Sequence, residues 1–148
     1  MPHKAQITTA EIDAVIGWTV IRAARRATRL LAAALAQHGL TPVEFGVLVQ
    51  LAAADAELSQ ADIARAVEMR PQSVAPTIDV LIKRGYLIRE GLRGSGRSSR
   101  LKLAPAGNSV VKASIQHVFA TNAAFTNDAA PTVALNLALL SFLESETT

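Results

Sequence analysis

Cysteine is absent from the 148 residues. This excludes disulfides, thiolate metal ligands and thiol-based redox sensing. The three histidines, His3, His38 and His117, are scattered along the chain, and none stands at metal-ligand spacing with another His, Asp or Glu. We therefore expect neither a metal site nor a bound cofactor.

Aromatic residues are scarce, with one Trp, one Tyr and four Phe, while half of the chain is apolar and rich in Ala. Such a composition favours a mainly helical protein. No run of 18 apolar residues occurs, and the N-terminal residues contain no apolar signal segment. We expect a cytoplasmic protein with no membrane partner.

The sequence also lacks a recognisable catalytic pattern. The glycines at 91, 94 and 96 fall in a predicted hairpin, so they are not a phosphate-binding loop between a strand and a helix. No serine stands in a nucleophile-elbow context. We therefore expect that the protein is not an enzyme.

Positive charge is concentrated in the middle of the chain. Residues 60–104 carry a net charge of +5, whereas the remaining residues together carry −2. A basic segment between slightly acidic flanks favours a polyanionic partner.

Helix-start signals divide the first half of the chain. Thr8, Thr41 and Ser59 each precede an acidic residue at capping-box spacing, and Pro42 and Pro71 suit the first turn of a helix. We predict helices over 8–37 and 42–54, then a short helix from Ser59 and another from about Pro71 to Gly85. Two short helices joined by three or four residues are typical of a helix-turn-helix.

The hydrophobic period changes after Gly85. Residues 86–89 and 99–103 read as strands around a Gly- and Arg-rich loop, which predicts a hairpin. Further helices are predicted from Pro105 to about Phe125 and over 132–143. No linker or repeat is evident, so we expect a single domain over 1–148.

Four segments in this order resemble the MarR family of bacterial regulators: Leu40–Phe45, Leu58–Ala64, Arg70–Val74 and Leu81–Leu87. The resemblance covers nearly the whole chain. It implies a mainly α winged helix-turn-helix with long N- and C-terminal dimerisation helices (about 8–37 and 107–145) and one small β-hairpin wing. The DNA-binding lobe would span about 41–104.

The resemblance implies a homodimer that binds a pseudo-palindromic operator in double-stranded DNA. Such a regulator would most often be a repressor released by a small aromatic or phenolic effector. The alternatives are a ligand-independent DNA-binding protein and a winged-helix module that binds proteins. A winged-helix module of that second kind usually lacks a basic recognition helix and wing.

Candidate DNA contacts lie on three elements, because a helix enters the major groove while basic wing residues meet phosphates or the minor groove. An alternative places the helix residues on a solvated face, with Ser59 acting only as a cap. Pro76 leaves two possibilities open: a helix from Pro71 with an internal proline, or a helix capped by Ser73. The candidates are Ser59, Gln60, Arg70, Gln72, Ser73, Thr77, Arg93 and Arg97.

Trp18, His38 and Phe45 are candidates for an effector cleft between the dimerisation helices and the DNA-binding lobe. The alternative is that Trp18 and Phe45 are ordinary core residues. Four arginines at 22, 25, 26 and 29 share one face of the first helix, and this pattern favours a solvated face or ion pairs to a partner subunit.

Overall fold

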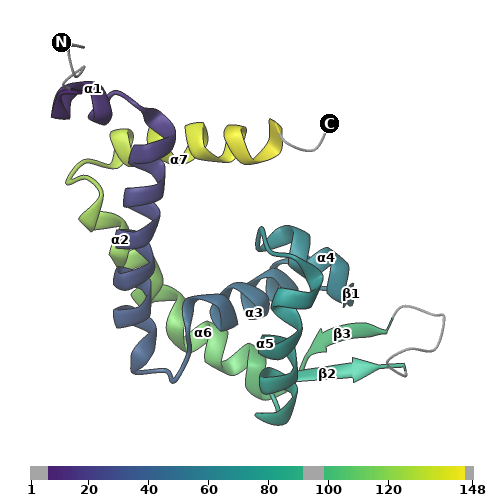
Figure 1. Cartoon of the computed structure of the whole chain (residues 1–148). Coiled ribbons are helices and arrows are strands. Elements are labelled where there is room, and N and C mark those ends of the chain that lie inside the picture. The colour runs from purple at the N-terminus through teal and green to yellow at the C-terminus, as the bar shows by residue number, and fades with distance from the viewer. Residues whose placement is uncertain (1–6, 92–98, 146–148) are drawn as a thin grey trace.

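The computed structural model describes residues 7–91 and 99–145. Seven α-helices, one 3-10 helix and three short strands follow one another in the described part of the chain (Figure 1). The prediction of a mainly α winged helix-turn-helix is confirmed. The elements are α1 (Thr9–Asp13), α2 (Ile16–Ala36), α3 (Pro42–Ala54), β1 (Leu58–Ser59), α4 (Gln60–Ala66), α5 (Pro71–Lys83), β2 (Leu87–Glu90), β3 (Arg100–Leu103), α6 (Pro105–Ala120), η1 (Thr121–Ala124) and α7 (Ala129–Glu144).

The helix starts predicted from the sequence are confirmed. Thr8, Thr41 and Ser59 each accept a hydrogen bond from the backbone N–H three residues ahead, and the acidic side chain there bonds back to the cap. Each reciprocal pair satisfies two N–H groups that the first turn of a helix leaves without partners.

The predicted single helix over 8–37 is wrong, because the chain leaves helical geometry between Asp13 and Ile16. Val15 has extended backbone angles, with φ −81° and ψ 100°. Two β-branched residues followed by Gly17 have low helix propensity, so a break there costs little. Arg22 Nη1 lies 2.8 Å from Asp13 Oδ1 and joins the two helices across the break.

The predicted helix from Pro105 to Phe125 is also too long. α6 ends at Ala120 and is followed by the 3-10 turn η1. The Thr121 hydroxyl donates to the Val118 carbonyl at 2.7 Å, and such side-chain bonds compete with helical ones. The last helix starts at Ala129, three residues earlier than predicted.

The wing contains a third strand that the sequence analysis missed. The sheet order is β1-β3-β2 and both pairings are antiparallel, with Leu58 opposite Leu101 and Leu87 opposite Leu103. β1 has only two residues, which is too short for an alternating pattern to reveal.

The hydrophobic core lies where α3, α4, α5 and the sheet meet the first half of α6. Its fully buried side chains include Leu48, Ile63, Ile78, Leu81 and Leu101. This packing fixes α5 against the wing, because both elements contribute to one core.

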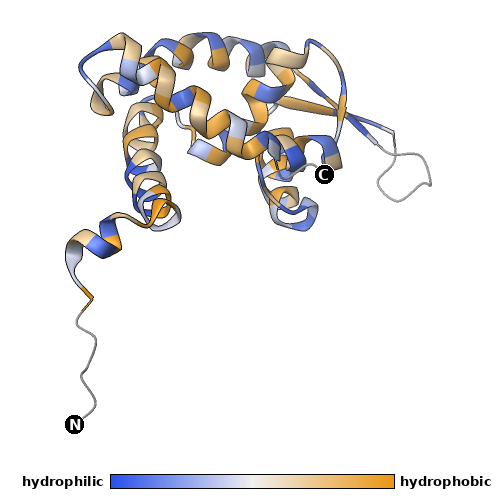
Figure 2. Ribbon diagram, turned by 90° about the horizontal axis from the view of Figure 1, so that it is seen from above, coloured by the Kyte–Doolittle hydropathy of each residue, from blue (hydrophilic) through white to orange (hydrophobic). Residues whose placement is uncertain are grey.

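Two helices extend from this core and a third stands apart from it. α2 and α6 lie side by side, and α7 crosses beyond their far ends (Figure 1). α7 has no buried residue, although hydrophobic residues run along its ribbon to the C-terminal end (Figure 2). Among the described residues, no helix is long and apolar enough to cross a membrane.

Candidate nucleic-acid interface

α5 presents its N-terminal residues to solvent. Val74, Ile78 and Leu81 are completely buried and form the inward stripe of the helix. The helical period therefore turns Arg70, Gln72 and Ser73 outward, and all three are exposed, whereas Thr77 is half-buried. The structure brings these four candidates together on the first turns of α5.

Pro76 lies inside α5, so the first of the two possibilities holds. The N–H groups of Ser73 and Val74 both donate to the Arg70 carbonyl, at 2.9 and 3.2 Å, and the helix begins at Pro71. Proline has no N–H, so the Gln72 carbonyl lacks its usual helical donor, at a cost of about 3 kcal/mol. The Gln72 carbonyl oxygen in the first turn of α5 is therefore left without the backbone donor that a regular helix supplies.

Ser59 and Gln60 lie beside this turn, and both have partners within the chain. The Ser59 hydroxyl is 2.6 Å from Asp62 Oδ2 and forms part of the α4 cap. Gln60 Nε2 donates to the Pro71 carbonyl at 3.0 Å. Gln60 therefore ties the start of α4 to the start of α5.

Arg93 and Arg97 lie outside the described residues, but the root of the wing is well defined. Arg89 Nη1 donates to Ser99 Oγ at 2.9 Å, and its Nη2 lies 3.5 Å from Asp79 of α5. The Arg89 side chain is only 15% exposed, and its buried Nη2 has no hydrogen bond to any of the residues that the structure describes. Arg89 is thus an ionic brace between the recognition helix and the wing.

This bracing role of Arg89 was not predicted from the sequence. Strand alternation was a usable signal, because Arg89 shares the inward face of β2 with the buried Leu87, while Ile88 and Glu90 are exposed.

Two carboxylates at the wing root are held in the ionised form. Hydrogen bonds from the Ser59 side chain and backbone, and then from Arg65, lower the pKa of Asp62. A hydrogen bond from Lys102, and then one with Glu57, lowers the pKa of Glu90. These carboxylates partly neutralise the positive charge at the wing root. By contrast, the first turn of α5 contains no acidic residue.

The structure does not bring the three effector candidates together. Phe45 is 8% exposed and belongs to the core. Trp18 lies near the N-terminal end of α2, 18 residues before the last residue of that helix, Ala36. The Arg25 guanidinium lies 5.9 Å from its ring. The helix from Trp18 to its C-terminal end is about 27 Å long. His38 lies in the turn between α2 and α3, in contact with His117 of α6.

His38 and His117, which are far apart in the sequence, are in contact in the structure, and the sequence spacing did not predict this contact. His38 Nε2 lies 3.0 Å from His117 Nδ1, and the ring centroids are 4.9 Å apart. The two residues are separated by 79 positions. Within residues 7–91 and 99–145, no group of three or more potential metal-ligating side chains occurs.

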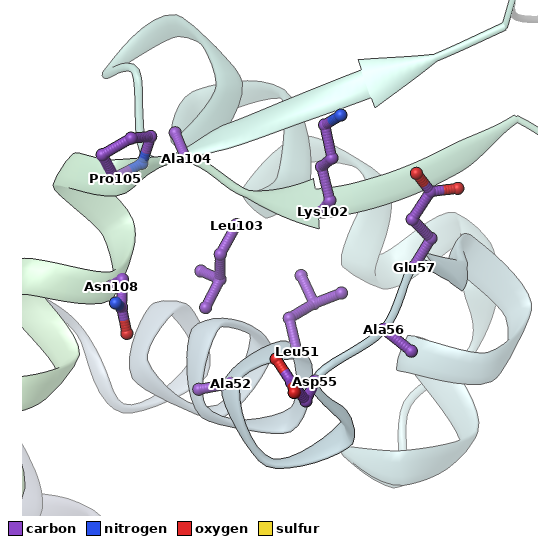
Figure 3. Close-up of a pocket in the computed structure, with 10 residues that line it drawn as sticks. All are labelled: Leu51, Ala52, Asp55, Ala56, Glu57, Lys102, Leu103, Ala104, Pro105 and Asn108. Atoms are coloured by element: carbon purple, nitrogen blue, oxygen red, sulfur yellow. The ribbon is translucent and has the colours of Figure 1, made fainter.

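Hollows among the described residues include one beside the wing and one among the long helices. One of about 530 Å³ lies between the end of α3 and the wing, where Asp55, Glu57 and Lys102 surround Leu51 (Figure 3). The other, of about 510 Å³, is mainly apolar and lies between α2, α6 and α7, with Leu31 among its lining residues.

A model of a known protein family matches part of the chain. Residues 38–98 match the MarR family model. No curated protein matches the sequence.

The fold is similar to that of several solved structures. A MarR-family transcriptional regulator from Rhodococcus sp. RHA1 is 20% identical, with 92% of this chain and 96% of that one aligned at a TM-score of 0.81. CouR, a transcriptional repressor bound to a 23-mer DNA duplex, is 21% identical over 95% of this chain and 99% of its own, with a TM-score of 0.77. CouR from Rhodococcus jostii RHA1 bound to p-coumaroyl-CoA gives 20% identity, coverage of 87% and 92%, and a TM-score of 0.75.

The family match includes the helix-turn-helix, and the similar structures extend over nearly the whole chain. Part of this chain, residues 38–98, thus matches the MarR family model, and its fold is that of solved MarR-family transcriptional regulators.

Proposed function

We propose that this protein is a sequence-specific DNA-binding regulator that reads the major groove with the N-terminal turns of α5. The observation that carries the proposal is the exposed trio Arg70, Gln72 and Ser73 on a helix whose opposite face is fully buried. A helix held this way presents its first turns as a rigid unit. CouR, which shares the fold, has been solved with a DNA duplex.

Each candidate has a role that its chemistry supports. Arg70 can donate two hydrogen bonds to guanine, and the Gln72 amide can pair with adenine. Ser73 and Thr77 suit base edges or phosphate, while Ser59 and Gln60 belong to the start of α4, where backbone N–H groups favour a phosphate. In the wing, Arg93 would meet phosphate and Arg97 a narrow minor groove.

We propose that two copies form a two-fold dimer through α7 and the ends of α2 and α6. α7 exposes a series of large apolar side chains, with Leu137 59% and Phe142 59% exposed, and none of its residues is buried. An apolar helix that finds no cover in its own chain is well explained by a second copy. The dimerisation helices would then hold two DNA-binding lobes over half-sites about 34 Å apart.

A repressor released by a small aromatic ligand is the regulatory mode that we propose. CouR has been solved with p-coumaroyl-CoA, which shows that this fold accommodates an aromatic acyl ligand in that protein. In the present chain, His38 is the candidate residue at the junction between the dimerisation helices and the lobe. A ligand there would shift the equilibrium only if it bound the free form more tightly than the DNA-bound form.

The decisive experiment begins with DNA fragments selected from a random pool by the purified protein. Binding of the selected operator and of random DNA is then measured by fluorescence anisotropy at several salt concentrations. We expect binding to random DNA at low salt that weakens steeply as salt rises.

Gln72→Ala separates base reading from general attraction because it leaves the charge unchanged. It should weaken operator binding by about 1–3 kcal/mol and leave random DNA nearly unaffected. Gln116→Ala is the matched control, since it also leaves the charge unchanged and this exposed glutamine lies on α6, outside the lobe. Equal weakening of operator and random DNA by Gln72→Ala would contradict base reading. Absence of any DNA binding at low salt would favour a protein-binding module.

A further inference from the structure

We propose that His38 and His117 form a two-imidazole site for a divalent transition-metal ion such as nickel, copper or zinc. The site lies at the junction of α2, α3 and α6. It does not depend on the proposed DNA-binding function, because it follows from the contact between the two rings.

The geometry of the pair suits a metal ion. The facing nitrogens, His38 Nε2 and His117 Nδ1, are 3.0 Å apart. Two imidazole nitrogens at about 2.0–2.1 Å from one ion lie about 2.8–3.1 Å apart at the ligand angle of about 90–95° that nickel and copper favour, and about 3.3 Å apart at the tetrahedral angle of zinc. The backbone therefore already holds the two rings at the separation that adjacent ligands need.

The hydrogen bond between the two rings is compatible with metal binding. Without metal, one of the two facing nitrogens carries the proton of the hydrogen bond. Each neutral imidazole can instead carry its proton on the other nitrogen, so both lone pairs then face the ion and no net proton is lost. Water completes the coordination, because His117 is exposed and His38 is only half-buried.

Ligand chemistry selects the class of ion. Imidazole nitrogen suits zinc, copper and nickel, whereas magnesium and calcium require oxygen ligands. A structural zinc site with four ligands binds its ion with about 10–16 kcal/mol. Half of this free energy, for two ligands, corresponds to a dissociation constant of roughly 1–200 µM. The Arg84 guanidinium bonds the neighbouring Gly39 carbonyl at 2.8 Å, and its positive charge favours the weaker end of this range.

The position of the site gives the ion a structural consequence. His38 belongs to the turn between α2 and α3. Arg84, the C-cap of α5, bonds the Gly39 carbonyl of the same turn and lies 3.3 Å from Glu44 in the first turn of α3. His117 belongs to α6. An ion shared by the two imidazoles would therefore cross-link α6 to the turn that anchors the end of α5.

The test uses the full-length chain without an affinity tag. Nickel or zinc chloride is titrated by calorimetry at pH 7.5, with magnesium chloride as the ion control. We expect one ion per chain from nickel or zinc and no heat from magnesium. At ten times the dissociation constant, the melting temperature should rise by roughly 3–6 °C.

His117→Asn distinguishes metal binding from the hydrogen bond, because the Asn amide can still donate to His38 Nε2 but is a poor ligand for these metals. The variant should melt at the temperature of the metal-free wild type and bind nickel at least tenfold more weakly. His38→Gln provides a second, independent removal of one imidazole. His3→Ala, which alters the third histidine, should leave binding unchanged.

Retention of nickel affinity in both His117→Asn and His38→Gln would overturn the site. Loss of binding in His3→Ala, or no binding by the wild type at 1 mM, roughly five times the weakest expected dissociation constant, would overturn it equally. A stoichiometric ion that is lost in both junction variants and kept in His3→Ala would establish it.

Discussion

Gly107→Ala is the substitution for which the structure makes the sharpest stability prediction. Gly107 lies in the first turn of α6, directly beneath the segment that joins α5 to the wing. A Cβ at this position would lie 2.2 Å from the Tyr86 carbonyl oxygen and 3.0 Å from Leu103 Cδ2. The carbonyl cannot simply retreat, because it accepts a hydrogen bond from the Ala104 N–H at 3.0 Å.

The expected loss can be worked out from three terms. Relief of the overlap requires a backbone shift, and overpacking of this kind costs about 1–3 kcal/mol or more. Weakening the bond from Ala104 adds about 1 kcal/mol. The higher helix propensity of alanine returns about 1 kcal/mol. We therefore expect Gly107→Ala to lower the free energy of unfolding by about 1–3 kcal/mol, with a fall in melting temperature of roughly 2–12 °C.

Gly46→Ala is the matched control. Gly46 also lies within a helix, α3, but its Cβ would meet Val67 Cγ1 at 3.5 Å, an ordinary contact. It should be neutral or stabilising by up to about 1 kcal/mol. Thermal and urea unfolding monitored by circular dichroism check both variants. If Gly107→Ala is as stable as the wild type, the close approach of α6 to the Tyr86 carbonyl is refuted.

Three further predictions test other parts of the structure. Pro76→Ala should raise the free energy of unfolding by about 1–3 kcal/mol, because it restores the donor to the Gln72 carbonyl at the cost of a more flexible unfolded chain; a less stable variant in thermal unfolding would contradict this. The hydrogen bonds from Ser59 lower the folded-state pKa of Asp62 below its ordinary value of 3.8, so the stability they confer is present above that value and lost as the pH falls through the lowered one. Asp62→Asn should therefore flatten the decline of the melting temperature below about pH 4, and an unchanged slope would argue against the cap. Deleting residues 131–148 should give aggregated or unfolded material by size-exclusion chromatography, whereas a folded monomer with undiminished DNA affinity would refute the proposed dimer interface.

The features predicted well from the sequence are those set by neighbouring residues. The caps at Thr8, Thr41 and Ser59 depend on side chains three positions apart, and the structure contains all three. The inward stripe of α5 follows from the helical period of Val74 and Ile78. Local bonding and periodicity require no knowledge of the rest of the fold.

Other features depend on distant contacts or weak local preferences. The strand β1 exists because Leu58 and Ser59 pair with β3, more than 40 residues away. The break at Val15 results from the low helix propensities of several neighbouring residues, whereas the apolar period of this segment is that of a continuous helix. The contact between His38 and His117 crosses 79 positions, so spacing along the chain gave no indication of it.

The position of α5 relative to the long helices depends on two contacts of different character. At the N-terminal end of α6, Gly107 packs directly against the Tyr86 carbonyl, so any movement of α6 is transmitted to the chain that leaves α5. On the other side, Arg84 at the end of α5 bonds the Gly39 carbonyl in the turn after α2 and the Glu44 carboxylate in the first turn of α3. The first contact is steric and rigid, whereas the second is an ion-assisted bond that can lengthen without a clash. In the proposed dimer, a change in the distance between the two DNA-binding lobes would therefore first lengthen or break the Arg84 hydrogen bonds. α6 and the wing would move together as one body.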